Sequence, residues 1–419
     1  MHVPDPAMTV THPSQDRDLR LAHKVISRCN WALKIPVRKW RMRKLRVAYD
    51  RGHSASARAI QAEEADPAII EAGRVLRERL LAGNERKHSA AGYRVLMLNP
   101  SGITSDFWFG DLEQCMRHAG IECQVLRHDT PAQVINATLE AFQPNVFIAL
   151  EAPQVLRALD LASLQSYKRR QGCLRLFVPV WHTKAPGGYA TPGYDEWRRR
   201  LRGSGLTVDA YFSIFEPEFH ERFSHDPAGP AIEYAAIPMA CNPMADYPVP
   251  AAKQYDYFMA TSLTNERLDV SYDFLRPILG RYPGLWAGPG WGFGMERVDP
   301  QDMRLRYAQT RIALSPLVKV VHRYGAELTH RVYAGAACGA FQLTMPTPIT
   351  GRYFRPGELV QAASPEEYGR LFDHFVGRPL ERNAIALAAL HRAYGEHTCF
   401  HRIDKLVSHW EDWRRRGLF

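Results

Sequence analysis

The feature that most constrains the fold is an alternation of short apolar runs with helical patterns, which occurs twice along the chain. The first series begins at Tyr93, where YRVLMLNPSG is typical of a buried strand that ends in a loop. The second series begins at Tyr255, after the proline-rich stretch CNPMADYPVPAAKQ, which is typical of an interdomain linker. Strands that alternate with helices of about 10–15 residues predict parallel sheets built from βαβ units. The sequence therefore predicts an α/β protein with two Rossmann-like, doubly wound domains.

The expected elements follow from the change of apolar period along the chain. In the first series, strands are expected from residue 93 and over 122–126, 146–150, 174–180, 208–214 and 233–238, with helices over 109–119, 131–142, 161–171 and 194–201. In the second series, strands are expected from residue 255 and over 285–287, 312–315, 340–344 and 359–362, with helices over 268–279, 300–310 and 327–338. From residue 365 onward the pattern is helical.

A length of 419 residues is too great for one ordinary core, which favours two domains with an appendage. We expect a basic, mostly helical extension over residues 1–90, with a helix over 54–81. The N-terminal acceptor-side domain is expected over 91–245 and the C-terminal nucleotide-sugar domain over 246–400. Residues 401–419 are expected to form a helix that crosses back to the first domain.

The composition is that of a soluble globular protein, with 46% hydrophobic and 23% charged residues. The chain contains no apolar run long enough to span a bilayer, and its first residues lack the apolar core of a signal peptide. Seven scattered cysteines without a CxxC pair argue against a zinc knuckle and against a disulfide framework. These features favour the reducing cytoplasm.

The positive charge is concentrated in one segment. Between Lys34 and Arg51 the chain has eight basic residues and one acid, so +7 of the formal net charge of +10 lies there and +3 elsewhere. Trp31, Trp40 and aliphatic residues alternate with these charges. Three interpretations stay open: a plain helix, solvated or packed against the protein; attachment to the inner, anionic face of a membrane, which a basic amphipathic pattern with tryptophan favours; or a nucleic-acid arm. Nucleic acid is the weakest of the three because no recognised module accompanies the charge.

Ligands of open parallel sheets bind beyond the carboxyl ends of the strands. The loop Thr261–Asn265 follows the strand that begins at Tyr255, and its hydroxyl and N–H groups at a helix start suit a phosphate. The alternative is a simple N-cap built from Thr264 or Asn265. The glycine-rich run 288–294 has the wrong spacing for a dinucleotide fingerprint, which favours a plain loop.

The stretch 308–344 holds the strongest functional pattern. A strand ends at Ser315 and is followed by a basic segment with Lys319, then by a helix whose face is poor in bulky side chains: Arg331, Gly335, Ala336 and Gly339. Small residues let another group approach a backbone closely. Arg331 could form a forked contact with a phosphate, or it could pair with Glu327 one turn earlier.

This stretch resembles the C-terminal domain of GT-B glycosyltransferases, in particular the family related to the spore-maturation protein CgeB. The matching residues are Arg331-Val-Tyr, Ala337-Cys-Gly and the segment from Phe354 to Val360, together with YDYFMATSLTNER upstream. The resemblance covers about residues 232–405. It implies two Rossmann-like domains facing a cleft, with the nucleotide-sugar donor bound in the second. The donor site expected from this resemblance and from the loops comprises Ser262, Asn265, Arg267, Ser315, Lys319, Glu327, Arg331 and Gly339.

The sequence departs from the family pattern at two positions. Ala334 stands where the family commonly has a glutamate that accepts hydrogen bonds from the donor ribose, and a methyl group cannot accept one. Glu327 could contact the donor differently, or it could be an acid favoured by the helix dipole. Ala260 replaces a glycine after the first strand of this domain.

The acceptor side is expected in loops after strands of the first domain. An inverting transfer needs a base for the acceptor hydroxyl, for which His182 and Glu151 are the catalytic candidates. A retaining transfer needs chiefly stabilisation of the leaving diphosphate. The acceptor-side loop candidates are Asn99, Ser101, Gly102 and Glu216. A capped loop end or a surface ion pair is the alternative role for each catalytic candidate.

The sequence thus predicts a metal-independent glycosyltransferase without a cofactor, since no Asp-x-Asp triad follows an apolar strand. Its partners would be a nucleotide sugar and a glycan, lipid-linked or protein acceptor. A sugar-nucleotide epimerase or hydrolase on the same scaffold is one alternative. A catalytically silent nucleotide-sugar-binding module, suggested by Ala334, is the other.

Overall fold

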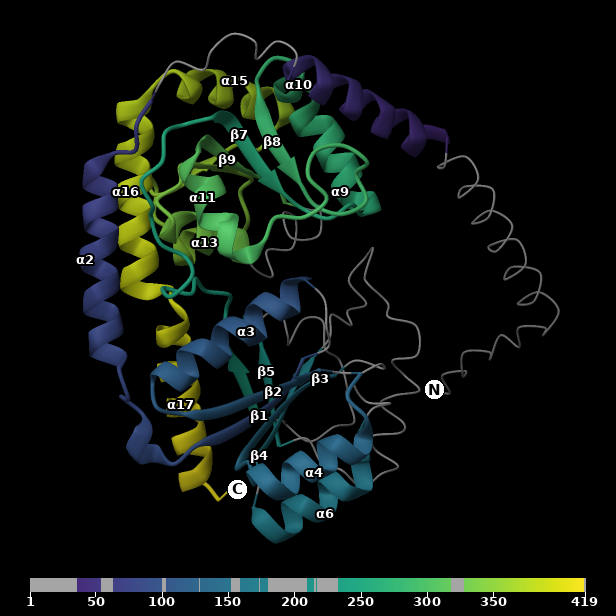
Figure 1. Cartoon of the computed structure of the whole chain (residues 1–419), viewed down its shortest axis with the longest axis vertical. Helices are drawn as coiled ribbons and strands as arrows, with labels where there is room; N and C mark the ends of the chain where they lie inside the picture. The colour runs from purple at the N-terminus through teal and green to yellow at the C-terminus, as the bar shows by residue number, and fades with distance from the viewer. Residues whose placement is uncertain are drawn as a thin grey trace, which may run out of the picture.

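Two parallel sheets form the framework of the molecule (Figure 1). The structure, a computed structural model, describes residues 36–53, 63–99, 103–127, 129–151, 159–172, 174–179, 209–214, 216, 233–317 and 328–417. Every structural statement below concerns these residues. The two sheets lie in separate halves of the molecule, so the expectation of two doubly wound domains is confirmed.

The first sheet has six parallel strands in the order β2-β1-β3-β4-β5-β6. They are β1 (Arg94–Asn99), β2 (Glu122–Arg127), β3 (Val146–Glu151), β4 (Leu174–Pro179), β5 (Ala210–Ser213) and β6 (Glu233–Ala236). The helices α3 (Ile103–His118), α4 (Ala132–Phe142) and α6 (Leu161–Gln171) connect them. The interior side chains of β1 and of Val146–Ala149 in β3 are fully buried, as an apolar run without alternation predicts for a sheet covered on both faces.

The second sheet has five strands in the order β11-β10-β9-β7-β8. They are β7 (Tyr255–Ala260), β8 (Gly284–Ala287), β9 (Thr310–Ser315), β10 (Gln342–Thr344) and β11 (Val360–Gln361). The connecting helices are α9 (Asn265–Val270), the π-helical turn η2 (Ser271–Leu275), α10 (Arg276–Leu279), the 3-10 turn η3 (Pro300–Asp302), α11 (Met303–Ala308), α13 (His330–Ala337) and α14 (Thr350–Tyr353).

Strands and most helices lie close to the expected ranges, and the differences concern helix ends. The helix expected over 54–81 was placed wrongly at its start, because residues 63–66 are not helical and α2 (Pro67–Asn84) begins after the Asp66 cap. Helix α3 begins at Ile103 rather than Phe109, because the polar residues 104–106 hide its first turns from an argument based on apolar period. The expected helix over 268–279 begins at Asn265, where Thr264 caps it, and contains the π-helical turn. Helix α13 begins at His330, three residues later than expected. The expected helix over 194–201 lies outside the described residues.

The C-terminal helices join the two halves. Helices α15 (Pro365–Val376) and α16 (Pro379–Glu396) belong to the second half, whereas α17 (Cys399–Arg415) packs against α3 of the first (Figure 1). The chain therefore crosses between the halves twice, once through residues 237–254 and once at the α16–α17 junction. The crossings are bonded to each other: Cys241 N donates to His397 O at 3.0 Å and Cys399 N donates to Cys241 O at 2.8 Å.

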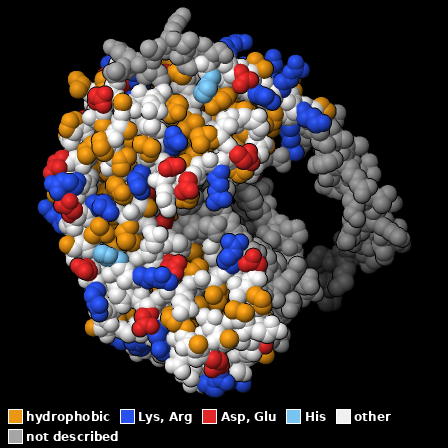
Figure 2. Space-filling view, in the orientation of Figure 1, with side chains coloured by type: hydrophobic (Ala, Val, Ile, Leu, Met, Phe, Trp, Pro, Cys, Tyr) orange, Lys and Arg blue, Asp and Glu red, His pale blue; other side chains and the backbone are white. Residues whose placement is uncertain are grey.

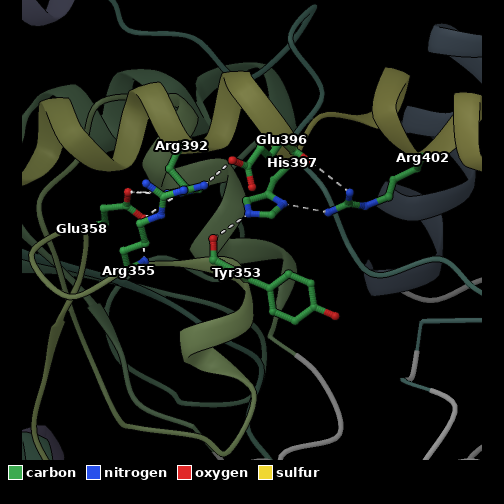
Figure 3. A network of polar contacts seen from close by, with 7 residues as sticks. All are labelled: Tyr353, Arg355, Glu358, Arg392, Glu396, His397 and Arg402. Atoms are coloured by element: carbon green, nitrogen blue, oxygen red, sulfur yellow. Dashed lines mark hydrogen bonds and ion pairs between the residues drawn. The ribbon is translucent and has the colours of Figure 1, made fainter.

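A buried histidine holds the second crossing in place (Figure 3). His397 Nε2 lies 2.6 Å from the carbonyl oxygen of Tyr353, and Arg402 Nη2 lies 3.2 Å from His397 Nδ1. Because the guanidinium can only donate, Nδ1 must accept, which fixes the neutral Nε2–H tautomer. Burial, with Arg402 beside it, lowers the pKa of His397 to about 3. On the other side of His397 from Arg402, Arg392 donates to Glu358 at 2.9 Å and pairs with Glu396.

The N-terminal extension packs on the second half. Helix α2 (Pro67–Asn84) lies along α16, and a helix over residues 36–53 lies against α9 and α10 (purple in Figure 1). Leu45 is fully buried there, and a side chain at Gly52 would place its Cβ 2.1 Å from Leu279 O. Arg41 forms a 2.5 Å ion pair with Asp269. One face of the basic segment therefore packs against the protein, as the first of the three interpretations proposed.

Candidate functional site

The order of the second sheet makes the ends of β7 and β9 the candidate position for a ligand. From β7 the chain proceeds to β8 on one side of the sheet, and from β9 it proceeds to β10 on the other side. At such a switch point the two connections diverge and leave a crevice beyond the carboxyl ends of the central strands. The strand ends there are Ala260 and Ser315.

Arg331 reaches this point from the first turn of α13. Its Nη1 donates to Ala260 O at 2.6 Å and lies 3.7 Å from Met259 Sδ. Burial, together with the nearby guanidinium of Arg267, lowers the pKa of Arg331 to about 10, so Arg331 is still a cation at neutral pH. Within the described residues no carboxylate lies within ion-pair distance of it; the alternative partner Glu327 lies outside them. A largely buried cation bonded to neutral acceptors attracts an anion.

Arg267 brings a second cation and Ser262 to the same place. Its Nη1 donates to Ser262 O at 3.1 Å and also to the Ser262 hydroxyl. The N-cap expected as an alternative is present, because Thr264 Oγ1 accepts from Arg267 N at 3.2 Å. Because Thr264 caps the helix, the Ser262 hydroxyl is not used for capping and bonds to Arg267 instead. Asn265 begins α9, and its side chain is outside the described residues.

The glycine-rich loop forms one wall of this site. Gly288 has a φ of 135°, and a Cβ there would lie 1.9 Å from Thr261 O. Trp291 Nε1 donates to Thr261 O at 2.6 Å, and Leu263 N donates to Pro289 O at 2.9 Å. Turns and bends form residues 289–294, and an isolated β-bridge at Met295 rather than a helix follows them. This is a packed loop, as expected, and lacks the strand–loop–helix context of a dinucleotide fingerprint.

The other donor-site candidates have different surroundings. Ser315 is buried at the end of β9, where its carbonyl accepts from Thr344 Oγ1 at 2.8 Å. Gly339 lies at the opposite, amino edge of the sheet, where a Cβ would lie 2.4 Å from Ile69 Cγ2 of α2. The structure thus separates Gly339 from the strand ends, because α13 runs from one edge of the sheet to the other. Lys319 and Glu327 lie outside the described residues.

The small-residue face of α13 has a structural cause. A Cβ at Gly335 would lie 2.9 Å from the side chain of Gln342, and Gln342 Nε2 donates to Val332 O at 2.8 Å. Ala336 is fully buried and Ala334 is nearly so. The close approach predicted for this face is therefore made by β10 of the protein rather than by a ligand.

The first sheet has its own switch point between β1 and β3. Asn99 ends β1 and is buried, and Glu151 ends the neighbouring strand β3. These two candidates are therefore adjacent along the edge of the sheet, although the side chain of Glu151 is not among those described. Ser101, Gly102 and His182 lie outside the described residues.

Glu216 follows β5 and reaches the second half of the molecule. Its carboxylate accepts a hydrogen bond from the Tyr353 hydroxyl of α14, and Arg352 Nη1 lies 4.0 Å from it. Residues that follow strands of the first sheet thus meet residues that follow strands of the second. The carboxyl edges of the two sheets face each other.

Comparison with known proteins agrees with this architecture. Residues 271–408 match the family model described as glycosyl transferase-like. Sucrose-phosphate synthase from Thermosynechococcus elongatus is similar in structure at a TM-score of 0.56 and 9% identity, with 78% of this chain and 99% of that chain covered. Anabaena HepE in complex with UDP and glucose is similar at 0.52 and 10%, with 76% and 100% covered.

T4 phage BGT in complex with its UDP-glucose substrate is similar at a TM-score of 0.50 and 11% identity, with 78% of this chain and 99% of that chain covered. The phage protein in complex with UDP and Mn²⁺ is similar at 0.52. The fold is GT-B. No curated protein matches the sequence of this chain.

Sequence reasoning missed a polar cluster between the halves of this GT-B protein. His330, which precedes Arg331 in α13, has its Nε2 3.2 Å from Asp111 Oδ2 of α3. Asn242 Nδ2 donates to Asp111 at 2.9 Å, and the Asp246 carboxylate accepts from Asn242 N at 2.8 Å. Burial disfavours the charged imidazole, but Asp111 outweighs this effect and raises the pKa of His330. No local pattern signals the cluster, because its members lie on three separate segments.

The buried linker carboxyl of this cluster gives a testable pH dependence. Burial raises the pKa of Asp246 from 3.8 to about 6, with His330 acting in the opposite direction. As pH rises from 4 to 6, the unfolded chain loses this proton first, so the free energy of unfolding of the wild type falls. Asp246→Asn cannot titrate and keeps an oxygen that can accept from Asn242 N. We expect its free energy of unfolding, measured in urea, to rise relative to the wild type between pH 4.5 and 6.5. A difference that stays constant over this range would contradict the assignment.

Proposed function

We propose that this GT-B protein is a glycosyltransferase that moves a sugar from a nucleotide-sugar donor to an acceptor. The observation that carries the proposal is the position of Arg331 and Arg267 at the switch point of the second sheet. A nucleotide sugar presents a diphosphate, and two guanidinium groups with forked donors match its oxygens. The same cations would stabilise the charge that develops on the leaving nucleoside diphosphate.

The fold neighbours suggest which donor to test first. The phage protein has UDP-glucose as its substrate, and HepE is similar to this chain in a complex with UDP and glucose. A UDP-sugar is therefore the first donor in our proposal, with the sugar itself left to experiment. The closer relationship to CgeB is part of the proposal and is supported by the motif from Arg331 to Gly339.

The acceptor belongs to the other switch point in this proposal. Asn99 and Glu151 end adjacent strands at the edge of the first sheet that faces the donor site. A glycan, lipid-linked or protein hydroxyl bound there would lie between the two sheets. Glu151 and His182 stay our candidates for the base that removes its proton in an inverting transfer.

Metal independence is also part of the proposal, and it can fail. Two arginines can neutralise a diphosphate without a divalent cation. We expect turnover in excess EDTA to equal turnover in buffer, measured as the rate of nucleoside diphosphate release. The phage neighbour has been solved with Mn²⁺, so the opposite outcome is a real alternative. Loss of turnover in EDTA, restored by manganese or magnesium, would contradict the proposal.

The decisive experiment measures nucleotide release from a panel of donors. UDP-glucose and UDP-N-acetylglucosamine, with GDP-, ADP- and dTDP-sugars as controls, are incubated with the protein in the presence of glycan acceptors. We expect UDP to appear together with a glycosylated product. Release of UDP with transfer of the sugar to water alone would indicate a hydrolase. Tight binding of UDP without any turnover would indicate the silent binding module that Ala334 suggests, and absence of both would contradict the proposal.

A further inference from the structure

The helix over residues 36–53 has an outer face whose apolar side chains are about half exposed. Its inner face packs through Leu45, Tyr49 and Gly52. Val37, Trp40 and Val47 lie outside this packed face and are 49%, 50% and 47% exposed. One side of the Trp40 ring packs beside Tyr272 of η2, with 5.4 Å between the ring centres, and the rest of the ring faces outward. Val37, Trp40 and Val47 are three of the six large hydrophobic side chains that are exposed in the described residues, although this helix is a small part of the chain. Single exposed apolar residues are ordinary on a protein surface. Here Val37 and Trp40 are three residues apart and Trp40 and Val47 are seven apart, so the three side chains form a stripe along the helix.

Basic side chains surround this stripe. The helix has seven basic residues and one acid, and within the described part of the chain only Arg41 forms a close ion pair with another element. Five of the others are exposed: Lys39, Arg43, Lys44, Arg46 and Arg51. Lys44 Nζ lies 5.8 Å from the centre of the Trp40 ring, so cation and indole share one surface. Figure 2 shows basic side chains grouped where this helix reaches the edge of the molecule.

We propose that this outer face binds the surface of an anionic lipid bilayer. A helix that lies in the plane of a membrane places an apolar stripe at the headgroup boundary and Lys and Arg beside it. Tryptophan is favoured at that boundary because its ring is apolar and its N–H is polar. The apolar area offered by one tryptophan and two valines is small, so anionic headgroups must supply most of the attraction.

The apolar stripe is what favours a bilayer over nucleic acid. A contact with duplex nucleic acid is made mostly by cations on phosphates, so apolar side chains beside these cations would contribute little to it. On a bilayer, the same side chains leave water and enter the boundary region. Binding to a bilayer is therefore expected to depend on Trp40, whereas binding to nucleic acid is not.

In this proposal, the half of the molecule that holds the candidate donor site is also the half that binds the membrane. Gly52 packs against Leu279 of α10, and the Tyr49 ring lies 5.2 Å from that of Phe293. Arg41 pairs with Asp269 of α9, the helix that carries Arg267. Membrane contact at the outer face would therefore be made by the half that carries the second sheet. The inference does not rest on the proposed chemistry, since binding is measured without donor or acceptor.

Vesicle flotation of the full chain tests the proposal. We expect binding to vesicles of phosphatidylcholine with 30% phosphatidylglycerol and none to phosphatidylcholine alone. The triple variant Lys39→Glu, Arg43→Glu and Arg46→Glu should lower the partition coefficient at least about tenfold. Trp40→Ser should lower it by several fold without any change of charge. The matched control carries Arg79→Glu, Arg169→Glu and Arg370→Glu, three exposed positions on α2, α6 and α15 with the same total charge change, and should bind as the wild type does.

Thermal unfolding of each variant detects a failure to fold. The outcomes that overturn the proposal are different from that failure. Equal loss in the triple variant and in its control would assign the binding to net charge alone. Unchanged binding of Trp40→Ser, with tighter binding to a 20-base-pair DNA duplex than to vesicles, would assign the face to nucleic acid. Absence of binding to anionic vesicles by the wild type would remove the proposal.

Discussion

Replacing Arg331 with alanine is expected to weaken the binding of UDP by about 30- to 1,000-fold. Two charge-assisted hydrogen bonds from one guanidinium to a diphosphate contribute on the order of 2–4 kcal/mol. Arg331 is held at the end of β7 by its bond to Ala260 O, so its remaining donors are positioned before the ligand arrives. Isothermal titration of UDP into the wild type and the variant measures the difference.

Two further variants separate a ligand contact from a general effect of charge. Arg331→Lys keeps the cation but loses the planar fork, so it should recover only part of the affinity. Arg370→Ala removes an exposed arginine that lies near Glu367 on α15, and it should leave the affinity unchanged. Equal affinity in all four proteins would remove Arg331 from the donor site. Loss of affinity accompanied by a large fall in melting temperature would assign Arg331 a structural role.

Replacing His397 with glutamine is expected to make the protein less sensitive to acid. The unfolded imidazole takes up a proton near pH 6.5, whereas the folded one stays neutral until its pKa of about 3. Between these values the unfolded state binds one more proton, so folding stability falls as pH falls, by up to about 1.4 kcal/mol per pH unit. From pH 6 to 4.5 the wild type should lose about 2 kcal/mol more stability than the variant. Urea unfolding at these two pH values measures the loss.

Glutamine is the informative substitution at this position because its amide can reproduce both bonds of the imidazole. Its N–H can donate to Tyr353 O, and its oxygen can accept from Arg402. His391→Gln, at an exposed position on α16, is the matched control. We expect the control to lose stability with falling pH as the wild type does. Parallel profiles for the wild type and His397→Gln would contradict the assignment.

The sheets could be predicted because their signals are local. An apolar run such as Val95–Leu98 has to be buried on both faces, and the helix after it has to cover one of them. Thus the two series of strands were visible without any knowledge of their partners. The start of α3 at Ile103 was not, because the first turn of this helix carries polar residues that resemble a loop.

The candidate site could be predicted in part, for a related reason. Ser262, Arg267 and Arg331 follow strands or begin helices, and the rule for parallel sheets brings such residues to one edge. Gly339 belongs to the same sequence motif but lies at the other edge, because eight helical residues lead away from the strand ends. The cluster of Asp111, Asn242 and His330 depends on how the two halves meet, and no pattern within either half contains that information.

The return of α17 to the first half makes that half a discontinuous folding unit. Its core combines the first sheet and α3 with α17, whose inner face is buried through Phe400, Ile403, Leu406, Trp410 and Trp413. During synthesis, the whole second sheet and α16 leave the ribosome before this helix does. The half that is synthesised first therefore completes its core last. Until α17 has been synthesised, the apolar surface around α3 lacks its covering helix.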